Sequence, residues 1–322
     1  AFVNIQDGEV VFDTTKIDGK NLTPNDLQAL LSLKKNNPGL NILASVGGWT
    51  WSKGFSDAAL TPESRARFAS SCARLVKTYN LDGIDLDWEY PNQPGAGNTY
   101  RREDTHNFTL MLKAVREALD GDPAGKHYLL TIATGADEAY VNNTELGELS
   151  QYLDFLNIMT YDFYNGLHKV TGHHSNLAPS VKPEMDKNSA INAVELHLKA
   201  GVPAKKLNLG IPFYGRKWEG VKDQGTNGLF QEAETVGMGI DYINFVNDIN
   251  QNGYTRYWDE SAQAPYLWNP EKRILISYED DTSIQAKMDY LKKAGLGGVM
   301  FWEYSADSNH QLQNAIAKGL GM

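Results

Sequence analysis

The stretch Leu81–Pro91, with the sequence LDGIDLDWEYP, carries three acidic residues in an otherwise apolar run. These residues, Asp85, Asp87 and Glu89, occupy every second position. The spacing predicts a β-strand with all three carboxylates on one face, because successive side chains of a strand point to opposite sides. Like charges this close are unfavourable in a protein interior unless they share protons or meet a charged ligand. We therefore predict that this strand takes part in chemistry.

Further apolar, β-branched runs recur along the chain with helix-like segments between them. This alternation is typical of repeated βα units and a parallel sheet. Several runs are continuously hydrophobic, as expected for strands that are buried on both faces. We predict seven such strands, at residues 1–5, 41–46, 83–88, 128–134, 154–161, 207–213 and 298–302.

The segment after Thr61-Pro62 has the signals of a helix that packs on this sheet. Thr is a good N-cap and Pro is favoured at the first helical position. The apolar side chains that follow, Phe68, Cys72, Leu75, Val76 and Tyr79, form a single stripe at helical spacing. Cys72 is the chain's one cysteine, and its place in the stripe predicts a buried structural thiol.

Between Gly215 and about Asp281 the βα rhythm gives way to Gly-rich turns and aromatic strand-like runs. We predict an α/β fold, a TIM (β/α)8-type barrel with an inserted α+β subdomain that emerges from a βα loop and walls the active site. Seven strands are one fewer than a closed barrel needs, so we expect the first βα unit to be missing from this chain. The predicted segments are 1–216 (barrel strands 2 to 7), 217–281 (insertion) and 282–322 (last barrel units).

Composition limits the class of partner. The formal net charge of −10 and the absence of Lys or Arg runs argue against nucleic acid as a ligand. No apolar stretch reaches the length of a membrane span, and the N-terminus lacks the order of a signal peptide. The chain has 7 Trp and 16 Tyr, several beside charges at predicted strand ends, and such rings stack well on sugars. A neutral partner is favoured.

Glu89 lies at the predicted C-terminal end of its strand, where barrel enzymes place catalytic groups. Carboxyl groups this close titrate as a coupled set, with at least one neutral near pH 7, and a protonated carboxyl is what general-acid catalysis requires. Three alternatives remain. The set could bind a divalent cation, form a solvated face of an edge strand, or belong to a binding protein that does no chemistry.

The motifs then identify a family resemblance. Residues 82–89 match the DxxDxDxE signature of glycoside hydrolase family 18, and the chain resembles the bacterial chitinases of that family that carry an α+β insertion. Four further motifs fall in family order: residues 45–49 (SVGGW), 159–162 (MTYD), 212–216 (PFYGR) and 298–302 (GVMFW). The resemblance implies an eight-stranded barrel.

The resemblance also implies substrate-assisted, retaining hydrolysis of β-1,4 linkages between N-acetylglucosamine residues. Glu89 would protonate the glycosidic oxygen while the carbonyl oxygen of the substrate's N-acetyl group attacks the anomeric carbon. Asp87 would bind the acetamido N–H, Asp85 would exchange a proton with Asp87, and Tyr161 would hold the acetamido carbonyl. Sugar-binding residues carried over from the motifs are Trp49, Tyr90, Met159, Asp162, Tyr214, Arg216 and Trp302. Asp82, Ser45, Gly47 and Gly48 are interpreted as structural support for the catalytic strand.

One departure concerns the loop after Asn165-Gly166, where relatives often carry Trp and this chain has Leu167 and His168. We interpret His168, His173 and His174 as a surface loop, not a metal cluster. The sequence thus predicts a secreted, monomeric chitinase with no cofactor, no metal, no nucleic-acid partner and no membrane partner, acting on chitin and its oligosaccharides. A chitin-binding lectin and an endo-β-N-acetylglucosaminidase of N-glycans remain the alternatives.

Overall fold

The structure is a computed structural model in which the chain divides into two compact units, and each is considered by itself. The residues that it describes are 2–12, 24–181 and 188–322. The first unit consists of residues 1–157 and 199–202, and the second consists of residues 158–198 and 203–322. No helix within the described ranges is long and apolar enough to cross a membrane.

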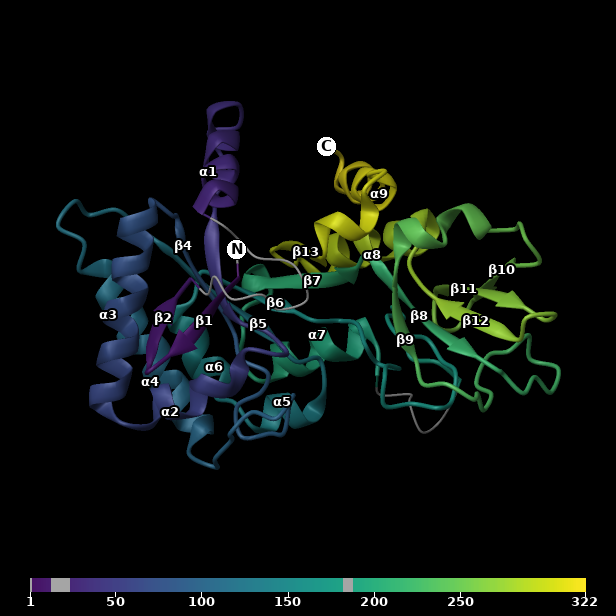
Figure 1. Cartoon of the computed structure of the whole chain (residues 1–322), viewed down its shortest axis with the longest axis horizontal. Helices are drawn as coiled ribbons and strands as arrows, with labels where there is room; N and C mark the ends of the chain where they lie inside the picture. The colour runs from purple at the N-terminus through teal and green to yellow at the C-terminus, as the bar shows by residue number, and fades with distance from the viewer. Residues whose placement is uncertain (1, 13–23, 182–187) are drawn as a thin grey trace. The chain divides into compact units, whose positions relative to one another are not determined.

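The first unit alternates strands and helices along the chain (Figure 1). Its strands are β1 (Phe2–Gln6), β2 (Glu9–Val11), β3 (Leu43–Gly47), β4 (Gly83–Asp87), β5 (Leu129–Thr134) and β6 (Phe155–Ile158, whose last residue already belongs to the second unit). Its α-helices are α1 (Pro24–Ser32), α2 (Phe55–Leu60), α3 (Pro62–Tyr79), α4 (Asp104–Asp120), α5 (Glu138–Asn142) and α6 (Leu146–Leu149). Helices α3 and α4 lie side by side and contact each other along their length.

Strand β4 lies between β3 and β5, with parallel pairing on both sides. The register places Ser45 opposite Asp85 on one side and Thr131 opposite Asp85 on the other. The apolar residues of the segment, Ile84, Leu86 and Trp88, are at most 1% exposed. Because β4 is not an edge strand, the alternative of a solvated strand face is wrong.

Gly47, next to β4, is required by how closely the strands approach. Gly47 has φ of 101°, and a Cβ atom there would lie 2.4 Å from the carbonyl oxygen of Asp87. Gly48 donates its backbone N–H to the same oxygen at 2.8 Å. Any side chain at Gly47 would therefore both strain the backbone and displace the end of β4. This contact explains why the SVGGW stretch supports the carboxylate strand.

The described residues of the second unit form a parallel strand pair, an antiparallel sheet and three α-helices, besides short 3-10 helices. Strand β7 (Leu207–Pro212) pairs in parallel with β13 (Gly298–Trp302). The antiparallel sheet has the order β10-β11-β12-β8-β9 (Figure 1). Its strands are β8 (Tyr214–Glu219), β9 (Met238–Asp241), β10 (Thr255–Asp259), β11 (Ala264–Asn269) and β12 (Ile274–Ser277). The helices are α7 (Ala190–Lys199, whose last residue belongs to the first unit), α8 (Asp281–Ala294) and α9 (Gln311–Leu320).

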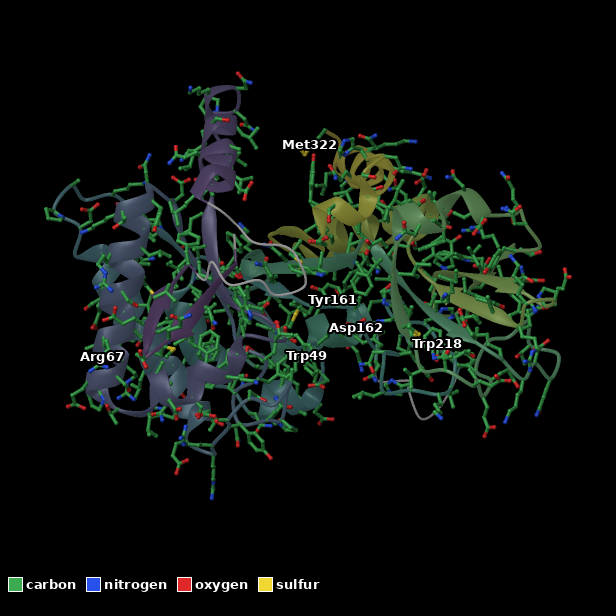
Figure 2. The ribbon with its side chains drawn as sticks, viewed as in Figure 1. Trp49, Arg67, Tyr161, Asp162, Trp218 and Met322 are labelled. Atoms are coloured by element: carbon green, nitrogen blue, oxygen red, sulfur yellow. The ribbon has the colours of Figure 1, made fainter. Side chains whose placement is uncertain are left out.

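The antiparallel sheet has an apolar core of its own. Trp218, on β8, is fully buried and packs in a cluster with Tyr164, Leu229, Trp268 and Leu275 (Figure 2). Burial of aromatic and aliphatic area on this scale stabilises a sheet that would otherwise be marginal. The break in the βα rhythm after Gly215 therefore corresponds to a distinct antiparallel sheet, as predicted.

All seven predicted strands are present, with ends that lie at most three residues from the predicted ends in the described ranges; Ala1, the first predicted strand residue, lies outside them. Helix α3 begins at Pro62 with Thr61 as its N-cap, and the Thr61 side chain accepts a hydrogen bond from the Ser64 N–H at 3.1 Å. Cys72 is fully buried, as predicted. Strand β2 was not predicted, although Asp7-Gly8 between two apolar runs is a hairpin signal.

Candidate active site

In the first unit, three carboxyl groups follow the inward face of β4 and its C-terminal extension. Asp85 accepts hydrogen bonds from Thr131 Oγ1 at 2.6 Å and from Ser45 Oγ at 2.8 Å, so both neighbouring strands hold it. Asp87 is 9% exposed and Glu89 is 8% exposed. Asp87 Oδ1 has no hydrogen-bond partner among the described residues, which leaves a buried acceptor open to a donor. The alternation predicted from sequence is confirmed.

The carboxyl groups of this strand have raised pKa values, and in Asp87 the neighbouring carboxylates add to the increase. Burial raises the pKa of Asp85, although the hydroxyls of Thr131 and Ser45 oppose the increase. Burial raises the pKa of Asp87 well above its usual value, and the charges of Glu89 and Asp85 raise it further. A carboxyl in this environment keeps its proton more readily than one in water. The set can therefore store and exchange protons.

The backbone at Glu89 is anchored by Ser52. The Glu89 N–H donates to Ser52 Oγ at 2.9 Å, and Ser52 Oγ donates to the Gly48 carbonyl at 2.9 Å. The next residue, Tyr90, has a raised pKa because of burial and then because of the charge of Glu89 and a hydrogen bond with it. Ser52 was not identified from the sequence, and no motif reasoning pointed to it.

Trp49 and Tyr90 lie together beside this strand. Their ring centroids are 6.5 Å apart, and Tyr90 also makes an edge contact with Tyr140 at 6.0 Å. Trp49 is 52% exposed, which is unusual for so large an apolar ring, and leaves its surface available to a ligand. Asp82 lies at the start of β4 and binds Lys34 Nζ at 2.6 Å, so its role there is structural.

In the second unit, Asp162 and Arg216 form a two-pronged ion pair. Arg216 Nε donates to Asp162 Oδ1 at 2.8 Å, and Arg216 Nη2 donates to Oδ2 at 2.6 Å. Burial would raise the pKa of Asp162, but the contacts with His174 and Arg216 hold it well below its usual value. Asp162 is thus a permanent carboxylate at ordinary pH. Figure 2 places Tyr161 next to it.

Tyr161 and Tyr214 form an edge-to-face pair with ring centroids 6.1 Å apart. The Tyr161 hydroxyl lies 3.9 Å from Met300 Sδ on β13. Trp302, at the end of the same strand, is 40% exposed. Met159 lies two residues before Tyr161 and is half-buried. The second unit thus brings together Tyr161, Asp162, Tyr214 and Arg216, while Asp85, Asp87, Glu89, Tyr90 and Trp49 gather in the first.

Comparison with known proteins decides the family. The model of the family described as "Glycosyl hydrolases family 18" matches residues 1–307. The chain belongs to glycosyl hydrolase family 18. It is 43% identical to Chitinase A1 of Niallia circulans over 99% of its own length, and spans 49% of that protein.

Solved structures agree with this membership. A family 18 N-acetylglucosaminidase from Paenibacillus barengoltzii superposes with a TM-score of 0.91 at 42% identity, covering 99% of this chain and 91% of that one. The Group IV chitinase of Ostrinia furnacalis in complex with allosamidin superposes with a TM-score of 0.88 at 29% identity, covering 100% and 89%. The predicted barrel fold with an inserted subdomain is confirmed, while the exact segment boundaries stay a prediction.

The histidine-rich segment of this family 18 chain differs from the prediction. His173 is 1% exposed and His174 is fully buried, so the interpretation of these two residues as a surface loop is wrong. The reason is that residues 171–177 are all buried, and several of their polar groups find hydrogen-bond partners within the unit. His173 Nε2 lies 3.1 Å from Asp259 Oδ2 on β10, and the His174 N–H donates to Ser277 Oγ at 2.9 Å. No cluster suited to a metal ion occurs in the described ranges.

Sequence reasoning also missed a buried ion pair near these histidines. Lys287 on α8 is fully buried and binds Glu279, which is 1% exposed. Lys287 Nζ also donates to the Ser175 carbonyl at 2.7 Å, and Ser283 Oγ donates to Glu279 Oε2 at 2.6 Å. The available signal was a Lys on the apolar stripe of α8, between Ile284 and Leu291.

We expect Asp87→Asn to stabilise the protein at neutral pH. The folded-state pKa of Asp87 is raised, so its contribution to stability is complete below the unfolded pKa of about 3.9 and is lost as pH rises towards the folded pKa. Asn carries no charge and escapes this loss. The gain at pH 7 should be about 0.5–2 kcal/mol, the usual range for relieving an unfavourable site. Thermal unfolding of both proteins from about pH 4 to about pH 8 measures it.

Asp162→Asn is the matched control, since the pKa of Asp162 is lowered. Asp162 contributes stability above its unfolded pKa, and this contribution is lost as pH falls through the folded pKa. The control should therefore destabilise the protein by a nearly constant amount from about pH 4 to about pH 8, because the Asp162 contribution is lost only below its unfolded pKa of about 3.9. Stability curves for Asp87→Asn that run parallel to wild type at every pH would contradict the raised pKa.

Proposed function

We propose that this chain is a chitinase that hydrolyses β-1,4 linkages between N-acetylglucosamine residues of chitin and chito-oligosaccharides by substrate-assisted, retaining catalysis. The observation that carries the proposal is the row of carboxyl groups along β4 and its C-terminal extension, with Asp87 and Glu89 buried and the pKa of Asp85 and Asp87 raised, in a family 18 chain. The protein named Chitinase A1 is a relative over nearly the whole chain. Because the chain spans about half of that relative, the activity of the whole protein is part of the proposal.

Glu89 is proposed as the general acid and base. It gives its proton to the glycosidic oxygen as the bond from that oxygen to the anomeric carbon breaks. The carbonyl oxygen of the substrate's own N-acetyl group forms the new bond to the anomeric carbon, which yields an oxazolinium ion. Water then attacks this carbon as its bond to the N-acetyl oxygen breaks, which restores the N-acetyl group, and the water gives a proton to Glu89. The common scheme in which a second enzyme carboxylate attacks the sugar does not apply, since the nucleophile comes from the substrate.

Asp87 and Asp85 are proposed to serve the acetamido group. The unpartnered Oδ1 of buried Asp87 is suited to accept the acetamido N–H, which aligns the carbonyl oxygen and stabilises the positive charge that develops. Asp85 is held by two hydroxyls and can exchange a proton with Asp87. Tyr161 is proposed to hold the acetamido carbonyl through its hydroxyl.

The remaining residues are proposed to bind the sugar. Exposed Trp302 and Trp49 offer ring faces for stacking, and the Asp162–Arg216 pair offers charged hydrogen-bonding groups. Tyr90, Met159 and Tyr214 are proposed to contact the sugar as well. The proposed mechanism uses no metal or organic cofactor, and we propose that the protein is a secreted monomer.

Two other functions would use the same residues differently. A chitin-binding lectin would bind the oligosaccharide without turnover, and an endo-β-N-acetylglucosaminidase would release N-glycans. The Paenibacillus relative is named an N-acetylglucosaminidase, so the size of the released product is a property to measure. Release of chromophore from a nitrophenyl chitobioside separates an enzyme from a lectin, and an N-glycoprotein substrate separates the two enzymes.

The stereochemistry of the product tests the mechanism itself. Retention predicts that the β-anomer of the new reducing end forms first, before mutarotation equilibrates it. Proton NMR of chitotetraose hydrolysis in its first minutes follows the anomeric signals directly. First appearance of the α-anomer would exclude substrate assistance while leaving the assignment of Glu89 as acid intact.

A further inference from the structure

His174 is a buried imidazole that the proposed mechanism does not use. It is fully buried, twelve positions after Asp162 in the chain. Its backbone is fixed from two sides, because its carbonyl accepts from the Phe163 N–H at 3.1 Å and its N–H donates to Ser277 Oγ at 2.9 Å. The ring position is therefore set by β12 and by the loop after Asp162.

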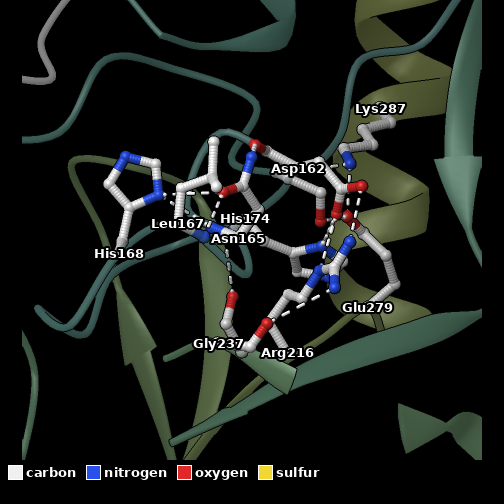
Figure 3. Close-up of polar contacts among 11 residues, drawn as sticks. Asp162, Asn165, Leu167, His168, His174, Arg216, Gly237, Glu279 and Lys287 are labelled. Atoms are coloured by element: carbon white, nitrogen blue, oxygen red, sulfur yellow. Dashed lines mark hydrogen bonds and ion pairs between the residues drawn. The ribbon is translucent and has the colours of Figure 1, made fainter. Parts of the chain in front are cut away.

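The ring lies between two carboxylates, each of which already has a cation (Figure 3). His174 Nδ1 is 3.7 Å from Asp162 Oδ1, beyond hydrogen-bond distance, while Arg216 holds Asp162 with two short hydrogen bonds. The other carboxylate is Glu279, which acts on His174 electrostatically and is paired with buried Lys287. Neither ring nitrogen of His174 has a hydrogen-bond partner in the described part of the chain.

The remaining titratable neighbour is Tyr214 on β8. Its ring lies 5.3 Å from the His174 ring, and burial raises its pKa well above the usual value, so it stays neutral. Burial lowers the pKa of His174, against the attraction of Asp162. The imidazole is thus neutral at pH 7 and gains its charge only in acid.

We propose that His174 is a positioning residue for Asp162. Neutral His174 leaves Asp162 paired with Arg216. Protonated His174 draws Asp162 Oδ1 towards its own ring and thereby weakens sugar binding. This inference rests on the proposed function, in which Asp162 and Arg216 contact the substrate. The short movement from 3.7 Å to hydrogen-bond distance would compete with the Arg216 Nε bond to the same oxygen. The new bond can compete because protonated His174 and Arg216 both make charge-assisted hydrogen bonds to a carboxylate, which belong to the same strength class.

The proposal has a reciprocal consequence. If protonation of His174 weakens binding, then binding of the sugar must disfavour protonation and lower the pKa of His174 by the same coupling. A residue that only fills space would show neither effect. Affinity and titration thus give two independent readings of one quantity.

The first test measures affinity for N-acetylchitotetraose by calorimetry in a Glu89→Gln background, which separates binding from turnover. Between about pH 7 and about pH 4, the affinity of Glu89→Gln should fall about tenfold more than the affinity of the double variant Glu89→Gln with His174→Asn. A tenfold difference lies within the usual range of coupling between two sites. The matched control is His173→Asn, because His173 faces Asp259 and not Asp162. Glu89→Gln with His173→Asn should lose as much affinity between about pH 7 and about pH 4 as Glu89→Gln alone.

The second test needs no substitution at His174. Proton NMR of the imidazole signals in Glu89→Gln, assigned with His174→Asn or by selective labelling, should show the pKa of His174 falling when chitotetraose is added. An unchanged titration, or the same acid loss of affinity in the presence and absence of His174, overturns the proposal while the proposed function stands. Failure of Glu89→Gln to bind chitotetraose at any pH overturns both.

Discussion

Glu89→Gln is expected to lower kcat for a chromogenic chitobioside by at least about 10²–10⁴-fold, the usual contribution of a general acid or base. Glu89 is 8% exposed at the end of β4, and its backbone is held by Ser52. Gln has nearly the same shape and keeps a hydrogen-bonding side chain, but it cannot give a proton to a leaving oxygen. Binding of chito-oligosaccharides should persist, so the loss should appear in kcat and not as a matching rise in KM.

The matched control for this prediction is Glu117→Gln on α4. Glu117 has a side chain that is 68% exposed and lies 3.9 Å from Lys113, so its replacement tests only the loss of a surface carboxylate. Its kcat should equal that of wild type. If Glu89→Gln kept a kcat near that of the control, Glu89 would not be the acid and the proposed mechanism would fail.

The seven predicted strands could be found from the sequence because their signals are local. Alternating carboxylates on β4 predicted its two faces, and Ile84, Leu86 and Trp88 are buried as that alternation requires. The Thr61-Pro62 start of α3 was equally local, since a cap and a fixed proline φ act within one turn. Patterns of this kind depend on the geometry of the backbone and need no knowledge of distant partners.

The roles of individual site residues came from a different source. Spacing alone predicted that Asp85, Asp87 and Glu89 share protons, and only the family motifs assigned the acid, the acetamido partner and the sugar-binding residues. The raised pKa of Asp87 depends on how deeply its strand is buried, which no local pattern encodes. Physical reasoning from the spacing predicted proton exchange between carboxyl groups, and the family resemblance predicted the hydrolysis reaction.

The buried histidines show where local reasoning fails. Polar residues 173–176, with the sequence HHSN, are typical of an exposed loop, yet all of them are buried. Their burial depends on partners far along the chain: Asp259 for His173, Ser277 for His174 and Glu279 for Ser175. Pairings of this kind, which join residues 86, 103 and 104 positions apart, are not visible in a single sequence.

Lys287→Met is expected to destabilise the protein by about 3–5 kcal/mol, although it replaces a charged side chain with an apolar one of similar length. Lys287 is fully buried against Glu279, so its removal leaves a buried carboxylate without its cation. The hydroxyls of Ser175 and Ser283 still reach Glu279, but neutral donors compensate a buried charge only in part. Urea denaturation at neutral pH measures the loss as a shift of the midpoint at constant slope.

A double substitution separates the loss of packing from the loss of charge compensation. In Lys287→Met with Glu279→Gln, no charge remains buried, so most of the stability should return, because replacing a whole buried pair is often neutral. Lys293→Met, at an exposed position of the same helix, should cost under about 1 kcal/mol. If Lys287→Met were as mild as Lys293→Met, the pair would not be desolvated, and the two serines would already satisfy Glu279. If the double substitution were as damaging as Lys287→Met alone, the loss would come from the shape of the Lys287 stem and not from its charge.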